Sequence, residues 1–328
     1  MSVPSPAGPP TVVALRALGL GDLLTAVPAL RGLRRAYPGH RLLLAAPEAL
    51  RPAVAATGAV DGLLPVAAPG RAVPPRVPWT GAPPACAVDL HGCGPESAAP
   101  LRALRPRRLL AYAAADGPAW HETEHERARW CRLLVHHGIP ADPDDLRIAP
   151  PPVPSPAPGA VVLHPGADAG ARRWPAERFA AVGRDLRAAG RTVVVTGGPS
   201  ERALAHRVAD AAGLPATAVL AGVPFPTLMA LVAGARAVVV GDTGIAHLAT
   251  ALGTPSVVLF GPVSPALWGP PGLPRHRVLW HPGAGPVTAR PGDAHGAEPD
   301  PRLLRITPPE VMAALDALDA AAAGRQPT

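Results

Sequence analysis

Four glycine-rich turns in the sequence each place an acidic, basic or hydroxyl side chain directly after a short apolar run. They are GLGD at 19–22, HPGA at 164–167, GGPSE at 197–201 and GDTG at 241–244. Glycine allows the backbone to approach a ligand closely, and the N-terminus of a following helix favours an anion. The spacing therefore predicts anion binding, and phosphate is the anion that such turns commonly hold.

The first turn does not fit a nicotinamide dinucleotide site. The fingerprint G-x-G-x-x-G would need glycine or alanine where Leu24 stands, and an acid at the end of the second strand, where Ala45 and Ala46 stand. Asp22 has a simple structural interpretation, because an aspartate at a helix start is a good N-cap.

The second half of the chain holds the other three turns, and basic side chains accompany them. Arg172 precedes the Trp174-Pro175 pair, and His247 follows GDTG by one helical turn. Arginine and helix N-termini together can hold a diphosphate without a metal ion. Three such turns in one half predict a binding face at the carboxyl ends of its strands.

One motif points to different chemistry. Residues 121–125 read H-E-T-E-H on a helix predicted at 122–137, which is the zinc-protease spacing of two histidines around a glutamate. No third ligand with its own motif is visible, and glutamates suit the first turn of an exposed helix. An exposed helix start is the favoured interpretation, and no metal site is expected.

Composition narrows the class of protein. The 328 residues carry a formal charge of +7, include no lysine, and contain only 3% aromatic residues. Anionic partners are favoured, but the sequence lacks the stacking residues and motifs of a nucleic-acid binder.

The three cysteines, Cys86, Cys93 and Cys131, do not have the spacing of metal ligands and predict free thiols in a reducing compartment. Without a signal sequence or an apolar run of ~18 residues, we expect a cytoplasmic protein, and such a protein can still dock on a membrane surface.

Apolar runs alternate with helical stretches on both sides of a linker at 140–158, which carries eight prolines. This pattern predicts an α/β fold of two Rossmann-like halves with parallel sheets. The expected division is a disordered N-terminus at 1–10, an N-terminal domain at 11–150, a C-terminal domain at 151–307 and a closing helix at 308–328, packed back toward the N-terminal domain. Strands are predicted at 11–15, 41–46, 85–90, 108–112, 161–163, 192–195, 237–240 and 256–260.

Three long segments, at 14–38, 161–204 and 232–270, resemble the signature regions of glycosyltransferase family 9, the ADP-heptose-type heptosyltransferases. The segment LLRITPPEVMAAL resembles the closing segment of that family. The resemblance implies a GT-B fold, in which two Rossmann-like domains face each other across a cleft, and an inverting, metal-independent transfer. One departure is clear: the family commonly carries cysteines where residues 281–301 have none.

The resemblance also implies roles for particular residues. Asp22 matches a proposed general base. The residues that match the donor-binding positions are His164, Gly166, Arg172, Glu201, Asp242, Thr243, Gly244 and His247. Gly21 and His91 are candidates on the acceptor side.

We therefore expect an enzyme that moves a sugar, a heptose or a related one, from an ADP-sugar-type donor to a hydroxyl acceptor. The expected partners are the nucleotide-sugar donor and a glycan, lipid-linked or small-molecule acceptor; no cofactor and no nucleic acid are expected. A catalytically silent nucleotide-sugar-binding or scaffold protein on the same fold is the alternative. Nucleotide binding without turnover would identify it.

Overall fold

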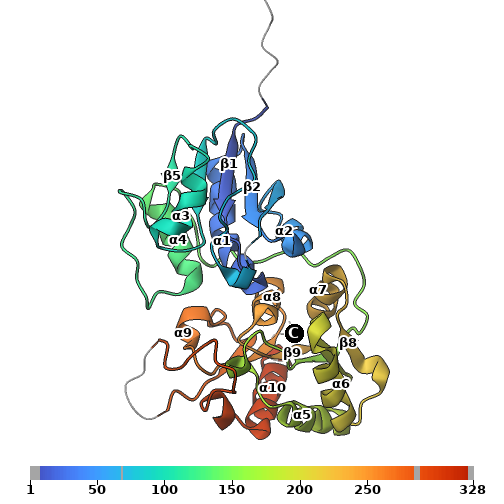
Figure 1. Ribbon diagram of the computed structural model, residues 1–328. Coiled ribbons are helices and arrows are strands. Elements are labelled where there is room, and N and C mark those ends of the chain that lie inside the picture. The colour runs from blue at the N-terminus through green and yellow to red at the C-terminus, as the bar shows by residue number, and fades with distance from the viewer. Residues whose placement is uncertain (1–7, 68, 284–288, 324–328) are drawn as a thin grey trace, which may run out of the picture. The chain divides into compact units, whose positions relative to one another are not determined.

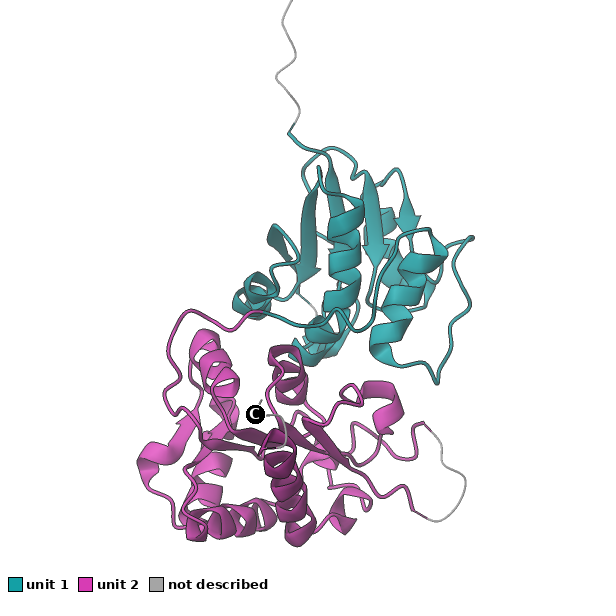
Figure 2. Ribbon diagram, turned by 180° about the vertical axis from the view of Figure 1, so that it is seen from behind, with its two compact units in different colours: residues 1–148 teal, residues 149–328 magenta. Residues whose placement is uncertain are grey.

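The computed structural model describes residues 8–67, 69–283 and 289–323 (Figure 1). Part of the predicted disordered segment 1–10 and the last residues of the predicted closing helix 308–328 therefore lie outside the described residues. The chain forms two compact units, residues 1–148 and 149–328 (Figure 2). The boundary between them falls within the proline-rich stretch, which contains neither helix nor strand.

The N-terminal unit contains one parallel sheet of five strands in the order β3-β2-β1-β4-β5. Its central strands β1, β2 and β4 are mostly apolar, as is typical of parallel strands covered on both faces. Helices α1 and α4 pack against each other, and α3 contributes Leu101 to a core cluster with Val13 and Leu15. The elements are β1 (Thr11–Leu15), α1 (Leu20–Ala36), β2 (Arg41–Ala46), α2 (Arg51–Thr57), β3 (Gly62–Pro65), β4 (Cys86–Asp89), α3 (Pro95–Arg102), β5 (Leu109–Leu110) and α4 (Glu126–His136).

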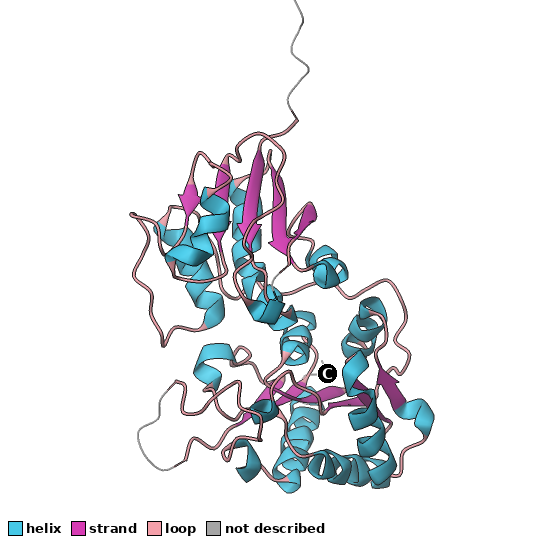
Figure 3. Ribbon diagram, in the orientation of Figure 1, coloured by secondary structure: helices cyan, strands magenta, loops and turns pink. Residues whose placement is uncertain are grey.

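The C-terminal unit contains a parallel sheet of six strands in the order β11-β10-β9-β6-β7-β8 (Figure 3). Alternate residues of its central strands, such as Leu163 and Val239, face a core shared with α5, α6 and α10. The elements are β6 (Val161–His164), α5 (Ala176–Ala188), β7 (Val193–Gly197), α6 (Arg202–Ala211), β8 (Val219–Ala221), α7 (Phe225–Ala233), β9 (Ala237–Gly241), α8 (Gly244–Leu252), β10 (Ser256–Leu259), α9 (Pro265–Trp268), β11 (His276–Leu279) and α10 (Pro308–Ala323). The predicted α/β class with two parallel sheets is confirmed.

The closing helix α10 belongs to the core of the C-terminal unit. It buries Val311, Leu315 and Leu318 there, against α5. The reason is the spacing of these residues, which places an apolar stripe on one face of the helix. Among the described residues, no helix has both the length and the apolar character that a membrane span requires.

Candidate functional site

In the C-terminal sheet, the strand order reverses between β6 and β9. Ligands of open α/β sheets bind at the carboxyl ends of the strands that flank such a reversal. The predicted turns 164–167 and 241–244 begin at the ends of these two strands, and 197–201 begins at the end of the neighbouring strand β7. Three separate parts of the sequence therefore meet at one end of the sheet.

Glu201 lies directly over the backbone that leaves β6. A Cβ atom on Gly166 would stand 2.2 Å from both carboxylate oxygens of Glu201, so a larger residue there would displace this carboxylate. The Glu201 carboxylate accepts a hydrogen bond of 2.7 Å from the N–H of Gly198, which fixes its position. His164 is beside it and only 7% exposed; burial lowers its pKa, against the opposing charges of Glu201 and Asp168. His164 is therefore a neutral imidazole at physiological pH.

Arg172 lies at the end of β9. Its Nη1 donates a hydrogen bond of 3.2 Å to the carbonyl oxygen of Asp242. The turn that carries Arg172 passes so close to the strand that a Cβ on Gly241 would stand 2.9 Å from the Arg172 carbonyl oxygen. The structure thus brings Arg172 and Asp242 together, as it does His164, Gly166 and Glu201.

Three buried polar atoms of this group have no hydrogen-bond partner within the described residues: His164 Nδ1, Arg172 Nε and Thr243 Oγ1. Thr243 is the N-cap of α8, yet its side chain makes no capping hydrogen bond, and Gly244 is the first residue of that helix. Buried polar groups are almost always hydrogen-bonded, because leaving one unpaired costs roughly 1–3 kcal/mol. Three such atoms lie at the carboxyl ends of β6 and β9, which indicates that a polar ligand binds there.

His247 lies one turn into α8. Its ring packs edge-on against Trp268 of α9, with the ring centroids 5.8 Å apart. The indole therefore helps to set the orientation of this imidazole.

Asp22 belongs to the N-terminal unit, and its position corrects the sequence interpretation. Helix α1 begins at Leu20, so Gly19 is the N-cap and Asp22 is the third helical residue. The Asp22 carboxylate accepts a hydrogen bond of 3.0 Å from the Gly19 N–H, so this side chain pairs with a backbone N–H at the start of the helix. Gly21 lies between them in that turn. Asp22 thus supports the helix start without being its N-cap.

His91 follows β4 and contacts the same region. The N–H of Ala17 donates to His91 Nδ1 at 3.2 Å. Burial, assisted by the positive charge of Arg16, lowers the pKa of His91 to about 4. The imidazole is therefore neutral, and because Nδ1 accepts a hydrogen bond, its proton resides on Nε2.

Two residues that the sequence interpretation missed are central to this unit. Arg16 is 1% exposed and Glu126 is 6% exposed, and their side chains form an ion pair of 2.7 Å. Arg16 carried one signal, since it directly follows the buried strand β1 and so had to lie inside the unit. Nothing in the sequence around Glu126 distinguishes it from its exposed neighbours.

The H-E-T-E-H segment is not helical, contrary to the prediction. Residues 121–124 form a turn, and His125 is the N-cap of α4, where its side chain accepts a hydrogen bond of 3.1 Å from the Arg127 N–H. The two histidines therefore do not share a helical face, as the zinc-protease motif requires. In the described part of the chain, no cluster of three or more His, Cys, Asp or Glu residues is arranged to hold a metal ion.

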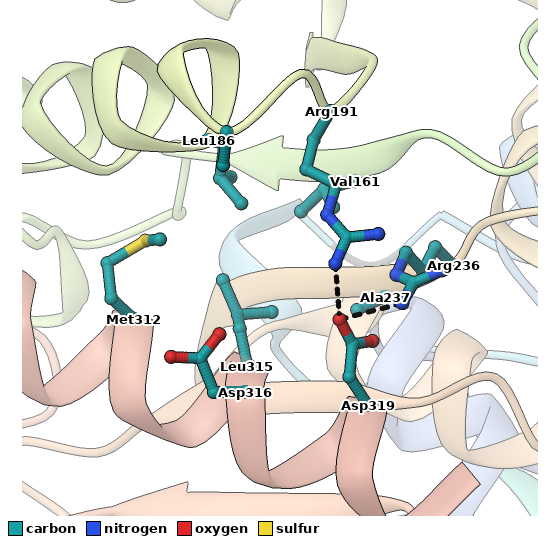
Figure 4. Close-up of a pocket in the computed structure, with 10 residues that line it drawn as sticks. Val161, Leu186, Arg191, Arg236, Ala237, Met312, Leu315, Asp316 and Asp319 are labelled. Atoms are coloured by element: carbon teal, nitrogen blue, oxygen red, sulfur yellow. Dashed lines mark hydrogen bonds and ion pairs between the residues drawn. The ribbon is translucent and has the colours of Figure 1, made fainter. Parts of the chain in front are cut away.

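A pocket in the C-terminal unit lies at the other end of the sheet, where β6 and β9 begin (Figure 4). Asp319 of α10 pairs there with Arg191 at 2.9 Å and with Arg236 at 2.7 Å. The pocket has a volume of about 60 Å³, which is far below the ~300–1,000 Å³ of small-molecule sites. With both guanidinium groups paired, this pocket joins α10 to the sheet and is not the candidate site.

Comparisons with known proteins agree with this geometry. A sequence profile of glycosyltransferase family 9 (heptosyltransferase) matches residues 142–287. Lipopolysaccharide heptosyltransferase 1 of Pseudomonas aeruginosa is 33% identical over 179 residues, which cover 51% of this chain and 48% of that protein. The matched stretch thus spans about half the length of this curated relative.

Two solved structures are similar over nearly the whole chain. Escherichia coli ADP-heptose LPS heptosyltransferase II gives a TM-score of 0.72 at 20% identity and covers 95% of this chain and 99% of its own. The E. coli heptosyltransferase WaaC, solved with ADP, gives 0.67 at 20% identity, with 93% and 99% covered. At this identity the likeness establishes the fold, which is GT-B. Sequence profile, relative and fold agree in showing that the chain is similar to the family 9 heptosyltransferases.

Proposed function

We propose that the protein is an inverting, metal-independent glycosyltransferase. It would transfer a heptose or related sugar from an ADP-sugar donor to a hydroxyl of an acceptor. The observation that carries this proposal is the group of three unpartnered buried atoms at the carboxyl ends of β6 and β9.

A diphosphate supplies what the unpartnered donors lack. Its oxygens can accept hydrogen bonds from Arg172 Nε and Thr243 Oγ1, and the first amides of α8 add the positive end of the helix dipole. These groups would stabilise the charge that develops on the departing nucleoside diphosphate, which is the role that a metal ion has in other transferases. Arg172 and α8 thus support a metal-free mechanism.

The neighbouring group suits the nucleoside. The Glu201 carboxylate can accept hydrogen bonds from ribose hydroxyls, and the neutral His164 can exchange one hydrogen bond through Nδ1. ADP as the nucleotide is supported by the E. coli enzyme that was solved with it.

The reaction would be a single displacement. The acceptor hydroxyl oxygen bonds to the anomeric carbon while the bond from that carbon to the phosphate oxygen breaks, and the diphosphate leaves with the electron pair. The hydroxyl proton passes to the Asp22 carboxylate. Attack from the face opposite the leaving group inverts the anomeric configuration.

The acceptor is less sharply defined than the donor. The relative from P. aeruginosa is a lipopolysaccharide heptosyltransferase by name, which favours a cell-envelope glycan as acceptor here, on a lipid or on a smaller precursor. A lipid-linked acceptor would bring the protein to a membrane surface.

Donor binding and turnover test the proposal together. Among ADP-, UDP-, GDP- and dTDP-sugars, we expect an ADP-sugar to raise the melting temperature most.

Arg172→Ala should weaken the binding of the ADP-sugar by about 1.5–3 kcal/mol, which is the contribution of a charge-assisted hydrogen bond. Arg191→Ala, at the opposite end of the sheet, should leave affinity unchanged. Equal affinity in Arg172→Ala would remove Arg172 from the site, and binding without any transfer to acceptor would identify a silent binding protein.

A further inference from the structure

Arg16 is the most completely buried arginine of the N-terminal unit, at 1% exposure. A guanidinium removed from water costs several kcal/mol unless its hydrogen bonds and its charge are both satisfied. In this unit both are satisfied, and by groups that come from three different elements.

The first two groups are the turns that flank the reversal of strand order between β1 and β4. Arg16 Nε donates to the Asp22 carbonyl oxygen at 2.9 Å, and Nη1 donates to the carbonyl oxygen of Leu90. Nη2 lies 3.5 Å from Asp22 Oδ1. One side chain therefore joins the turn that carries Asp22 to the turn that carries His91.

The third group is Glu126 of α4. Its Oε1 accepts hydrogen bonds from Arg16 Nη2 at 2.7 Å and from Trp130 Nε1 at 2.9 Å, while Oε2 binds Arg129. The Trp130 ring also lies against the Arg16 guanidinium, 4.8 Å from its carbon. Burial alone would raise the pKa of Glu126, but the charge of Arg16 and its hydrogen bond lower it overall, so Glu126 is ionised.

The same contacts give the H-E-T-E-H segment a role. Arg129 Nη2 donates to the carbonyl oxygens of His121 and Glu124, at 2.9 and 3.0 Å, while its Nη1 binds Glu126. The carbonyl oxygens of the 121–124 turn thus bind Arg129. The guanidinium of Arg129 binds Glu126, and Glu126 in turn binds Arg16. Two arginines and two carboxylates thus form one chain of ion pairs that runs from Arg129 to Asp22. At Asp22 the more exposed Arg71 adds an ion pair of 3.9 Å to Oδ2.

We propose that Arg16, held by Glu126, is a positioning residue of the transferase, fixing the Asp22 carboxylate in one orientation relative to the turn after β4. This inference rests on the proposed role of Asp22 as the base. Asp22 Oδ1 faces Arg16 and Oδ2 accepts the Gly19 N–H. The carboxylate is thereby held at both oxygens, and each retains a lone pair for the proton of the acceptor hydroxyl.

Arg16→Lys tests this role. Lysine keeps the charge but cannot reproduce the fork of donors, so the carboxylate would lose its fixed orientation. We expect kcat to fall about tenfold with donor KM within about twofold of wild type. The matched control is Arg31→Lys on α1, whose guanidinium forms a partly exposed ion pair of 2.7 Å with Asp145.

A double-mutant cycle separates positioning from general support of the fold. If Arg16 acts through Asp22, Arg16→Lys should change kcat less than about twofold in an Asp22→Asn background. An equal loss in both backgrounds, or an unchanged kcat in the single variant, would overturn the proposal. If Arg16→Lys fails to fold, Glu126→Gln takes its place in the same cycle and is judged by the same outcomes.

Failure of the base assignment would look different. Asp22→Asn alone would then retain its activity, whatever Arg16 does. Melting temperatures of the same four proteins report the contact without any turnover: we expect the shifts from Arg16→Lys and Asp22→Asn to be non-additive, and strict additivity would contradict the described contact.

Discussion

In our proposal Asp22 has two tasks, pairing with the Gly19 N–H at the start of α1 and accepting a proton, and one substitution separates them. An asparagine side chain in its place would keep an oxygen for the Gly19 N–H but could not take a proton. For Asp22→Asn we expect kcat to fall by roughly 10²–10⁴-fold, the usual contribution of a general base, while the affinity for donor changes little. Steady-state kinetics and donor calorimetry on the folded variant measure both. A variant that transfers sugar at more than about a tenth of the wild-type rate would defeat the catalytic assignment.

His91 should make the stability of the protein sensitive to acid. Its pKa of about 4 in the folded protein lies below the ordinary value of 6.5. Between these two pH values the unfolded chain binds a proton that the folded one does not, so stability falls as the pH drops below about 6.5. His91→Asn keeps an acceptor for the Ala17 N–H without titrating. Its melting temperature should therefore drop less between pH 7 and pH 4.5 than that of wild type.

The exposed His121 supplies the control for this measurement. His121→Asn should show the same loss of melting temperature on acidification as the wild type. An equal loss in His91→Asn would mean that the imidazole is not the group responsible.

Single residues of the donor group could be predicted because their types repeat a pattern of glycine with charge at strand ends. Glu201 and Arg172 stand in such turns, and the structure places both at the end of the C-terminal sheet. Arg16 and Glu126 could not be predicted as a pair, because 110 residues separate them and only the folded unit brings their charges together.

Among the elements, the central strands could be predicted and the edge strands could not. Each central strand of both sheets contains a run of at least three apolar residues, which is what burial on two faces selects. The four edge strands were missed or drawn too long: β3, β8 and β11 were not predicted, and β5 has two residues where five were expected. An edge strand has one neighbour, so its length depends on that pairing more than on its own sequence.

The segment 293–300 matters to the turn that carries Arg172. Gly296 accepts a hydrogen bond of 2.9 Å from the Ala171 N–H, and the Asp300 N–H donates to Ala171 at 3.2 Å. A Cβ on Gly170 would stand 1.5 Å from the carbonyl oxygen of Ala297, which is a backbone atom that cannot simply rotate away. Residues 293–300 therefore hold the turn that carries Arg172 close to the end of β9.

Gly170→Ala should displace that turn. We expect donor affinity to fall about tenfold, because Arg172 moves with the turn, together with a lower melting temperature. Gly272→Ala is the matched control in the same unit, since a Cβ there meets nothing within 4 Å. Donor titrations of both variants measure the effect. A Gly170→Ala protein with wild-type affinity would show that the segment does not set the position of Arg172.

At the scale of the whole molecule, the two-unit organisation could be predicted from one proline-rich stretch between two alternating patterns. The contacts of the closing helix with the core of the C-terminal unit could not be predicted, because an apolar stripe shows that a helix packs but not what it packs against. The acceptor could not be predicted, since the N-terminal unit carries few charged turns with a recognisable pattern.

Dependence on metal is also a property of the whole enzyme. Because Arg172 and the N-terminus of α8 supply positive charge to the diphosphate in our proposal, transfer should continue in the presence of EDTA. An assay of turnover before and after chelation decides the matter. If chelation abolishes transfer and magnesium or manganese restores it, the metal-independent mechanism is wrong.

Because every strand of the C-terminal sheet runs in the same direction, the sheet has two chemically unequal ends. The proposed donor residues lie at one end, and the Asp319 pairs with Arg191 and Arg236 lie at the other. Damage at the second end should appear as a change in melting temperature, with affinity for the donor intact. A fluorescent label or a tether to a sensor surface therefore belongs near Asp319, where it can report binding at the far end of the sheet without touching the ligand.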